Sequence, residues 1–146
     1  MLTMMVAVDG SEHSLQAVRH AIWLVGQGLR ARIVLAHVQE STSLVEIAMA
    51  GPAGAADASV DAGMHLIGPA VQLLRDAGLD HEVEVRIGDV PPTLLDIAES
   101  HQAAMILIGA TDEGALSRIF LGSIGNKLVS NSRVPVTIVK IPALDD

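Results

Sequence analysis

Short segments with the hydrophobic pattern of β-strands alternate with segments of helical spacing along the whole chain. The strand-like segments are residues 3–9, 32–38, 81–87, 104–109 and 134–141. Apolar residues three or four positions apart predict helices in the intervening stretches, at residues 11–29, around residues 67–78, from Pro91 or Pro92 onward, and at residues 122–131. This alternation predicts an α/β fold, in which an open parallel five-stranded sheet carries helices on both faces and right-handed crossovers.

The composition is that of one globular domain. The chain has 146 residues, and half of them are hydrophobic, which is enough for a full core. No repeat or second domain is visible, so residues 1–146 are predicted to form a single domain. Aromatic side chains are almost absent, so we expect the core to be aliphatic.

Charge and composition argue against several kinds of partner. The formal net charge is −8, and Trp23 and Phe120 are the only aromatic residues, so neither charge nor base stacking favours a nucleic acid. The chain has no cysteine, which excludes disulfides and thiol catalysis. The N-terminal residues do not show the basic region followed by a long apolar stretch that is typical of a signal peptide. No apolar run approaches the ~20 residues of a membrane helix. We therefore expect a soluble cytoplasmic protein without a membrane partner.

One long connection interrupts the pattern. Ser, Ala and Gly dominate residues 41–63, and such small residues offer little apolar surface to offset the entropy of ordering. We therefore expect a mobile connection, with a short helical turn at 44–50 as an option. In the next helix Gly68 and Pro69 predict either a start near Gly68 or a kink, and the kink is the preferred interpretation.

The stretch 104–141 carries the pattern that bears most directly on function. An uninterrupted apolar run ends at Gly109, and thirteen residues later Gly122 and Ser123 precede the apolar steps of a helix. A glycine at a strand end and a Gly-Ser pair at a helix start suit a phosphate, because the backbone can approach closely and unpaired N–H groups are available. On spacing alone, a plain connecting loop with glycine turns is the favoured alternative.

This spacing resembles the fingerprint G-x2-G-x9-G-[ST] of the nucleotide-binding branch of the universal stress protein family. Gly109, Gly122 and Ser123 fall on three of its positions, while Asp112 replaces the second glycine. The opening VAVDGSEHS and the HV at 37–38 resemble the family's first strand and turn and the end of its second strand. The resemblance covers nearly the whole chain and implies a Rossmann-like sheet of strand order 3-2-1-4-5.

The resemblance also implies a set of nucleotide-binding residues at the carboxyl ends of the strands. Those expected beside the adenine and ribose are Ala7, Val8, Asp9 and Val38. Those expected toward the ribose and phosphates are Ile108, Gly109, Asp112, Gly122, Ser123 and Ile124. Asp9 has a second interpretation, since an acidic residue at a strand–helix turn often only binds nearby amides.

The remaining polar residues suggest no catalytic or metal centre. We expect His37 to be covered by its apolar neighbours, and His13 and His20 to face solvent. No pair of residues has the spacing of a metal site. Ser11 and Ser14 have no paired base, which argues against nucleophilic catalysis.

Three functions remain open. The first is a stress-response or signalling module that binds ATP, ADP or AMP without dedicated catalytic machinery. The second is a ligand-free interaction protein of the same family, an option that Asp112 keeps open. The third is an enzyme that cleaves ATP between its α- and β-phosphates, which the turn Asp9-Gly10-Ser11 disfavours because it lacks paired glycines.

Two further expectations follow from the resemblance. The last strand, Val134 to Ile141, is apolar with one free edge, and the family pairs this strand across a two-fold axis, so we expect a homodimer. Asp112 places a negative charge where the family has glycine. We therefore expect weakened ATP binding and a dependence on magnesium or manganese, while AMP and ADP lose little.

Overall fold

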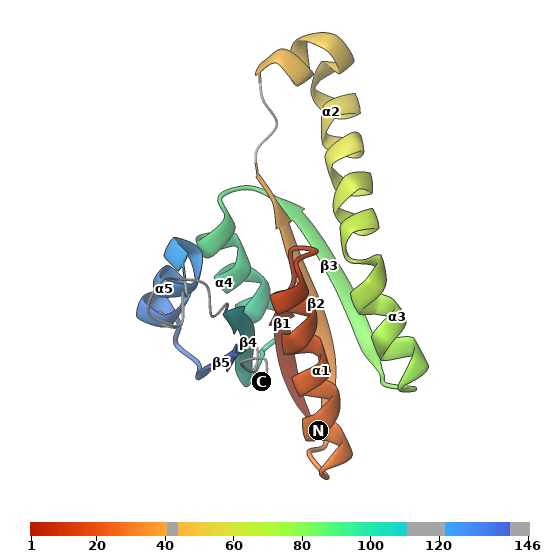
Figure 1. The fold of residues 1–146 in the computed structure, drawn as a ribbon. Coiled ribbons are helices and arrows are strands. Elements are labelled where there is room, and N and C mark those ends of the chain that lie inside the picture. Colours follow the sequence, from red (N-terminus) through yellow and green to blue (C-terminus); the bar gives the residue numbers. More distant parts are fainter. Residues whose placement is uncertain (41–43, 111–121, 141–146) are drawn as a thin grey trace, which may run out of the picture.

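The computed structural model describes residues 1–40, 44–110 and 122–140, and its strands form one parallel five-stranded sheet. The sheet order is β3-β2-β1-β4-β5, as the family resemblance implied (Figure 1). The strands are β1 (Leu2–Ala7), β2 (Ala31–Gln39), β3 (His81–Ile87), β4 (Met105–Ala110) and β5 (Val136–Lys140). The order of the strands across the sheet reverses at β1. This strand comes first in the chain and lies at the centre of the sheet, with β2 and β4 as its neighbours.

Helices connect successive strands and cover both faces of the sheet. They are α1 (Glu12–Gly26), α2 (Leu44–Leu66), α3 (Gly68–Asp76), α4 (Val90–Ser100) and α5 (Gly122–Asn131). Ser11 caps α1, because its hydroxyl accepts a hydrogen bond from the Ser14 backbone N–H at 3.3 Å. Pro91 and Pro92 fall in the first turn of α4, where the missing N–H groups cost no helical hydrogen bond.

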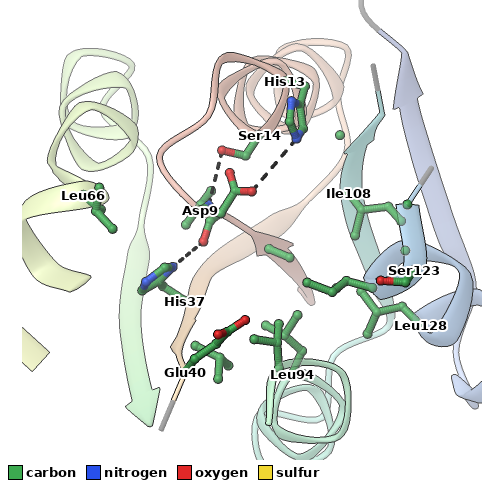
Figure 2. A pocket seen from close by; sticks show the side chains of 18 of the residues that line it. Asp9, His13, Ser14, His37, Glu40, Leu66, Leu94, Ile108, Ser123 and Leu128 are labelled. Carbon is green, nitrogen blue, oxygen red and sulfur yellow. Dashed lines mark hydrogen bonds and ion pairs between the residues drawn. The ribbon is translucent and has the colours of Figure 1, made fainter. Parts of the chain in front are cut away.

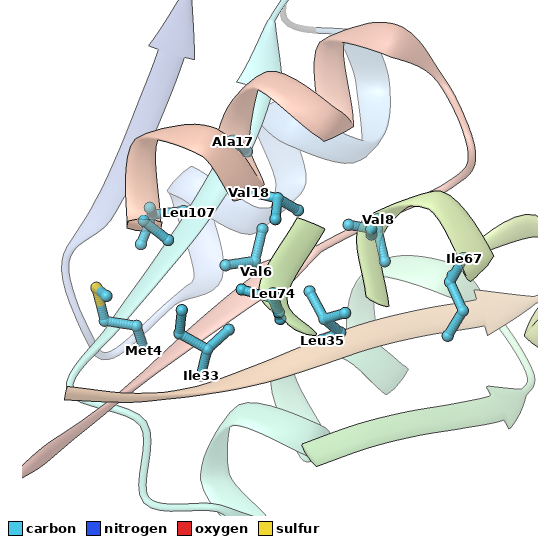
Figure 3. Packing of buried hydrophobic residues seen from close by; sticks show 12 residues of the cluster. Met4, Val6, Val8, Ala17, Val18, Ile33, Leu35, Ile67, Leu74 and Leu107 are labelled. Carbon is cyan, nitrogen blue, oxygen red and sulfur yellow. The ribbon is translucent and has the colours of Figure 1, made fainter. Parts of the chain in front are cut away.

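Alternating side chains of the strands divide the core into two layers. On one face Met4 and Val6 of β1 pack with Val18 of α1 and Leu74 of α3 (Figure 3). On the other face Met5 packs in the layer that α4 and α5 cover. Both layers are aliphatic, as expected, and Trp23 lies outside them with 56% of its surface exposed.

The connection that we expected to be irregular is helical in its described part. Residues 44–66 form α2, which is interrupted at Gly51 and rises beyond the strand ends in Figure 1. The predicted connection over residues 41–63 allowed a short helical turn at 44–50, and the structure extends the helix to residue 66; residues 41–43 lie outside the described part. Pro69 sits in the first turn of α3, so a new helix begins at Gly68 directly after α2 instead of one helix kinking there.

The edge strand β3 alternates apolar and polar or charged residues along His81–Ile87. Its charged face is tied to the end of α4 by His101. The Nε2 atom of His101 lies 2.9 Å from Glu84 Oε1, and its Nδ1 atom lies 3.4 Å from Glu82 Oε2. Arg86 adds a contact of 3.2 Å to Glu84, and Arg32 on β2 pairs with Glu82. The two His101 contacts fasten the edge strand to the end of α4, whereas the Arg32–Glu82 ion pair joins it to β2.

We expect Glu84→Gln to lower the free energy of unfolding near neutral pH by roughly 0.5–1 kcal/mol, the usual range of a partly exposed ion pair. The hydrogen bond from His101 is the largest cause that holds the pKa of Glu84 below its ordinary 4.5. A depressed folded-state pKa contributes stability that is present above the unfolded-state value and is lost as pH falls through the folded-state value.

The difference between the two proteins, measured by urea unfolding, should therefore shrink from about pH 6 to about pH 3. Glu99→Gln, at an exposed position of α4, is the matched control and should show little difference at any pH. A Glu84→Gln deficit that stays constant over this range would contradict the role of the carboxylate charge.

Candidate functional site

A pocket of about 780 Å³ lies at the carboxyl ends of β1, β2 and β4. This is the part of the sheet in which the strand order reverses, between β1 and β4. Ligands of open α/β sheets bind at this position, and the volume falls in the range of small-molecule sites. The walls come from the turn before α1, from α4, α5 and the end of α2 (Figure 2).

The structure brings together almost all of the residues that the sequence singled out. Ala7, Val8, Asp9, Val38, Ile108, Gly109, Gly122, Ser123 and Ile124 all line this one pocket. Asp112 lies outside the described residues. The set comes from four separate segments of the chain, so their convergence depends on the tertiary fold.

The turn between β1 and α1 holds Asp9 at the pocket wall. Asp9 Oδ1 accepts a hydrogen bond from the Ser11 backbone N–H at 2.9 Å and a second one from the Ser11 hydroxyl. The Asp9 backbone N–H in turn donates to Ser14 Oγ at 3.4 Å. One carboxylate oxygen therefore serves the turn, as the local interpretation of Asp9 predicted, and the other faces His13, whose Nε2 lies 4.0 Å away.

The electrostatic environment keeps Asp9 ionised. Burial by itself raises the pKa of Asp9, but the two hydrogen bonds from Ser11 and the neighbouring His13 together outweigh it, so the net shift is downward from 3.8. The pocket therefore carries a fixed negative charge at the start of α1.

Gly109 at the end of β4 is where α1 touches the sheet most closely. A Cβ atom at this position would lie 2.0 Å from the His13 carbonyl oxygen and 3.0 Å from the Ser14 backbone nitrogen. Both neighbours are backbone atoms, which cannot rotate away. Gly109 is thus required by helix packing in addition to any role toward a ligand.

The first turn of α5 closes the opposite wall. Gly122 begins the helix with φ of 77°, a left-handed conformation that glycine adopts without strain. Gly122, Ser123 and Ile124 border the pocket with the first residues of the helix, whose backbone N–H groups have no partner within the helix. This end of the pocket can donate hydrogen bonds to an anion.

His37 lies in the wall as a structural residue. It is 5% exposed, and its Nδ1–H donates to the Val8 carbonyl oxygen at 2.7 Å, while its Nε2 lies 2.6 Å from Gln39 Oε1. The expectation of a covered histidine is confirmed. With both ring nitrogens occupied, His37 links β2 to β1.

Several pocket residues were not predicted from the sequence. His13 was expected to face solvent, but its side chain is 31% exposed and borders the pocket beside Asp9. Its place in the first turn of α1, one turn after Asp9, was the available signal. The others are Ser14, His37, Gln39, Glu40, Leu66, Val90, Leu94, Gly125 and Leu128. The apolar members had no local signal, because in sequence they are ordinary core positions of their helices.

Within the described ranges, no three or more His, Cys, Asp or Glu side chains are grouped so that they could hold a metal ion. None of the described helices combines the length and the hydrophobicity that crossing a membrane requires.

The comparisons with known proteins identify the class. The model of the universal stress protein family matches residues 1–140. Since this match spans nearly the whole chain, the protein belongs to the universal stress protein family. The resemblance predicted from the Gly109, Gly122 and Ser123 pattern is therefore confirmed at the level of the family.

Individual relatives agree with this assignment. The chain is 28% identical to the stress response protein NhaX of Bacillus subtilis, over 92% of this chain and 95% of that protein. A universal stress protein family protein from Arabidopsis thaliana with AMP bound has a TM-score of 0.69, 21% identity, and coverage of 98% of this chain and 94% of that one. The universal stress protein from Archaeoglobus fulgidus in complex with dAMP has a TM-score of 0.70, 19% identity, and coverage of 96% and 98%. The two structures share the Rossmann-like fold of this chain.

Gly109→Ala should destabilise the protein by roughly 3 kcal/mol or more, because the added methyl group meets backbone atoms of α1. Thermal and urea unfolding would measure the loss. Gly26→Ala, in the last turn of α1 with nothing within 4 Å of its added Cβ, is the control and should be nearly neutral. If Gly109→Ala and Gly26→Ala have the same free energy of unfolding, the close contact between α1 and β4 does not exist in solution.

Proposed function

We propose that the protein is an adenine-nucleotide-binding module of stress response or signalling, which binds AMP, ADP or ATP in the pocket at the carboxyl ends of the strands. One observation carries the proposal: Gly109, Gly122 and Ser123 of the family fingerprint and the residues of the first two strand ends converge on this pocket. Relatives of the same fold have AMP or dAMP bound, which supports the choice of nucleotide.

The pocket suits the parts of a nucleotide. Apolar side chains of the central strands and of α4 and α5 offer flat contact to a base, which is the usual character of a small-molecule site. Val38 and the Ala7–Asp9 segment are proposed to flank the adenine and ribose. Gly109 and the first turn of α5 are proposed to meet the ribose and phosphates, since that turn presents N–H groups and the Ser123 hydroxyl.

We propose binding without dedicated catalysis. The Ser14 hydroxyl donates to the Ser11 carbonyl oxygen at 2.9 Å, and the Ser11 hydroxyl donates to Asp9 inside the turn. Among the described residues no histidine is hydrogen-bonded to either hydroxyl, so no activated nucleophile is formed there. A cytoplasmic location likewise remains a prediction from the sequence.

The proposal is tested by calorimetry of AMP and ATP binding, with and without magnesium or manganese. The same measurements on the Asp112→Gly variant test the one fingerprint position at which this sequence departs from the family. We expect the wild type to bind AMP. We expect Asp112→Gly to gain about 1 kcal/mol of ATP affinity in metal-free buffer, since removing the carboxylate relieves its repulsion from phosphate oxygens across a solvated loop. AMP affinity should change little.

The possible results separate the candidate functions. Absence of binding by both nucleotides would favour the ligand-free interaction protein, and release of diphosphate from ATP would favour the α/β-cleaving enzyme. If Asp112→Gly binds ATP no more tightly than the wild type without metal, Asp112 does not lie at the phosphates.

We also propose a homodimer formed through β5. This strand is the free edge beyond β4, and Ile138 is 36% exposed on it. The Ile106 N–H donates to the Pro135 carbonyl oxygen, so the backbone groups of Pro135, Thr137 and Val139 face β4. The backbone groups of Val136 and Ile138 therefore point outward, where a second copy of the strand can pair with them.

Ile138→Pro should give a monomer that keeps its fold, because proline removes an outward N–H and no hydrogen bond of the β4–β5 ladder. Sedimentation at micromolar concentration would report the mass, and circular dichroism the fold. Thr137→Pro is the comparison, since it removes an inward N–H and should damage the sheet itself. A folded Ile138→Pro protein that remains dimeric would contradict pairing through this edge.

A further inference from the structure

The polar side chains of the pocket differ in how free they are to bind a ligand. Asp9 Oδ1 is held by Ser11, and both nitrogens of His37 are occupied by Val8 and Gln39. The Ser14 hydroxyl donates to the Ser11 carbonyl oxygen. These atoms shape the wall and have little capacity left for a ligand, whereas Asp9 Oδ2 faces His13 Nε2 at 4.0 Å and accepts no hydrogen bond from the described residues.

Glu40 is different. It follows the last residue of β2, two positions after Val38, and its exposed side chain borders the pocket. No side chain of the described residues makes a hydrogen bond or ion pair with its carboxylate. Figure 2 shows Glu40 on the β2 side of the pocket near Leu94, while Ser123 lies on the opposite side, on α5.

Glu40 and the start of α5 therefore have opposite hydrogen-bonding character. A carboxylate only accepts hydrogen bonds, so Glu40 offers an acceptor on the β2 side, next to Gln39, whose amide contacts His37. The α5 side offers the N–H groups of a helix start and the Ser123 hydroxyl. The side chains between them are apolar: Val38, Leu94, Ile108 and Leu128.

This arrangement sets the orientation of a nucleotide. A phosphate placed beside Glu40 would be repelled by a like charge, whereas at α5 it would meet donors. The base then lies toward β2, against the apolar wall. The group of the base that reaches Glu40 must donate a hydrogen bond.

We propose that Glu40 is a specificity-determining residue, whose carboxylate accepts a hydrogen bond from the exocyclic 6-amino group of the base. The 6-oxo group of hypoxanthine would instead present an acceptor to the carboxylate and be rejected, because two acceptors leave both groups unpaired. This inference rests on the proposed nucleotide-binding function, and it assigns to Glu40 the discrimination between 6-amino and 6-oxo purine nucleotides.

The test is calorimetry of AMP and IMP against the wild type, Glu40→Gln and Glu40→Leu. The wild type should prefer AMP by about tenfold, the discrimination expected from a charged hydrogen bond at a partly solvated site. Glu40→Leu should lose most of this preference through weaker AMP binding. Glu40→Gln should lose it through stronger IMP binding, because the amide N–H can donate to the 6-oxo group.

Glu99→Gln removes a negative charge from an exposed position of α4 and is the control for the long-range effect of charge. It should change the affinities of AMP and IMP by the same factor and leave their ratio intact. Equal affinities of AMP and IMP in the wild type, or a preference that survives in Glu40→Leu, would overturn the role of Glu40 and leave the nucleotide-binding function standing. If neither nucleotide binds to the wild type, the proposed function fails and the role of Glu40 with it.

Discussion

The close contact between the first turn of α1 and the end of β4 is the constraint on which the site depends. It exists because position 109 is glycine: any side chain there would overlap the His13 carbonyl group. The contact brings the β1–α1 turn against the neighbouring strand end, so that Asp9, His13 and Ser14 border the same pocket as Ile108. A glycine that resembles a ligand-binding position in the sequence therefore also sets the helix–sheet distance that forms the pocket.

A second close contact explains why the helix α2 forms where composition argued against order. Gly63 lies in α2 above β2 and β3, and a Cβ atom there would be 2.9 Å from Val85 Cγ1 and 3.0 Å from His37 Cδ2. The helix rests almost directly on the sheet at this point. Small residues, which predicted a loose connection, here permit close packing. The error arose because intrinsic preference is local, whereas packing against a sheet can override it.

The pocket combines rigid and available groups. Local hydrogen bonds engage Asp9 Oδ1 in the β1–α1 turn and both ring nitrogens of His37 on β2. His37 is buried, and a buried polar group whose hydrogen bonds are satisfied holds a wall in one conformation. Glu40 at the end of β2 and the helix start at Gly122 and Ser123 remain available on opposite sides. The geometry thus separates residues that build the pocket from residues that can select its ligand.

The sequence by itself determined the class of fold and nine of the residues around the pocket, those at the strand ends and at the start of α5. Strand and helix periodicity and the spacing from Gly109 to Ser123 are local patterns, so they can be recognised without the fold. Only the tertiary structure decided that residues 44–66 form a helix, that His13 faces the pocket, and that Glu40 and Leu94 share it with the strand ends. These features depend on how separate segments pack across the sheet, and no periodicity within one segment specifies the distance to another.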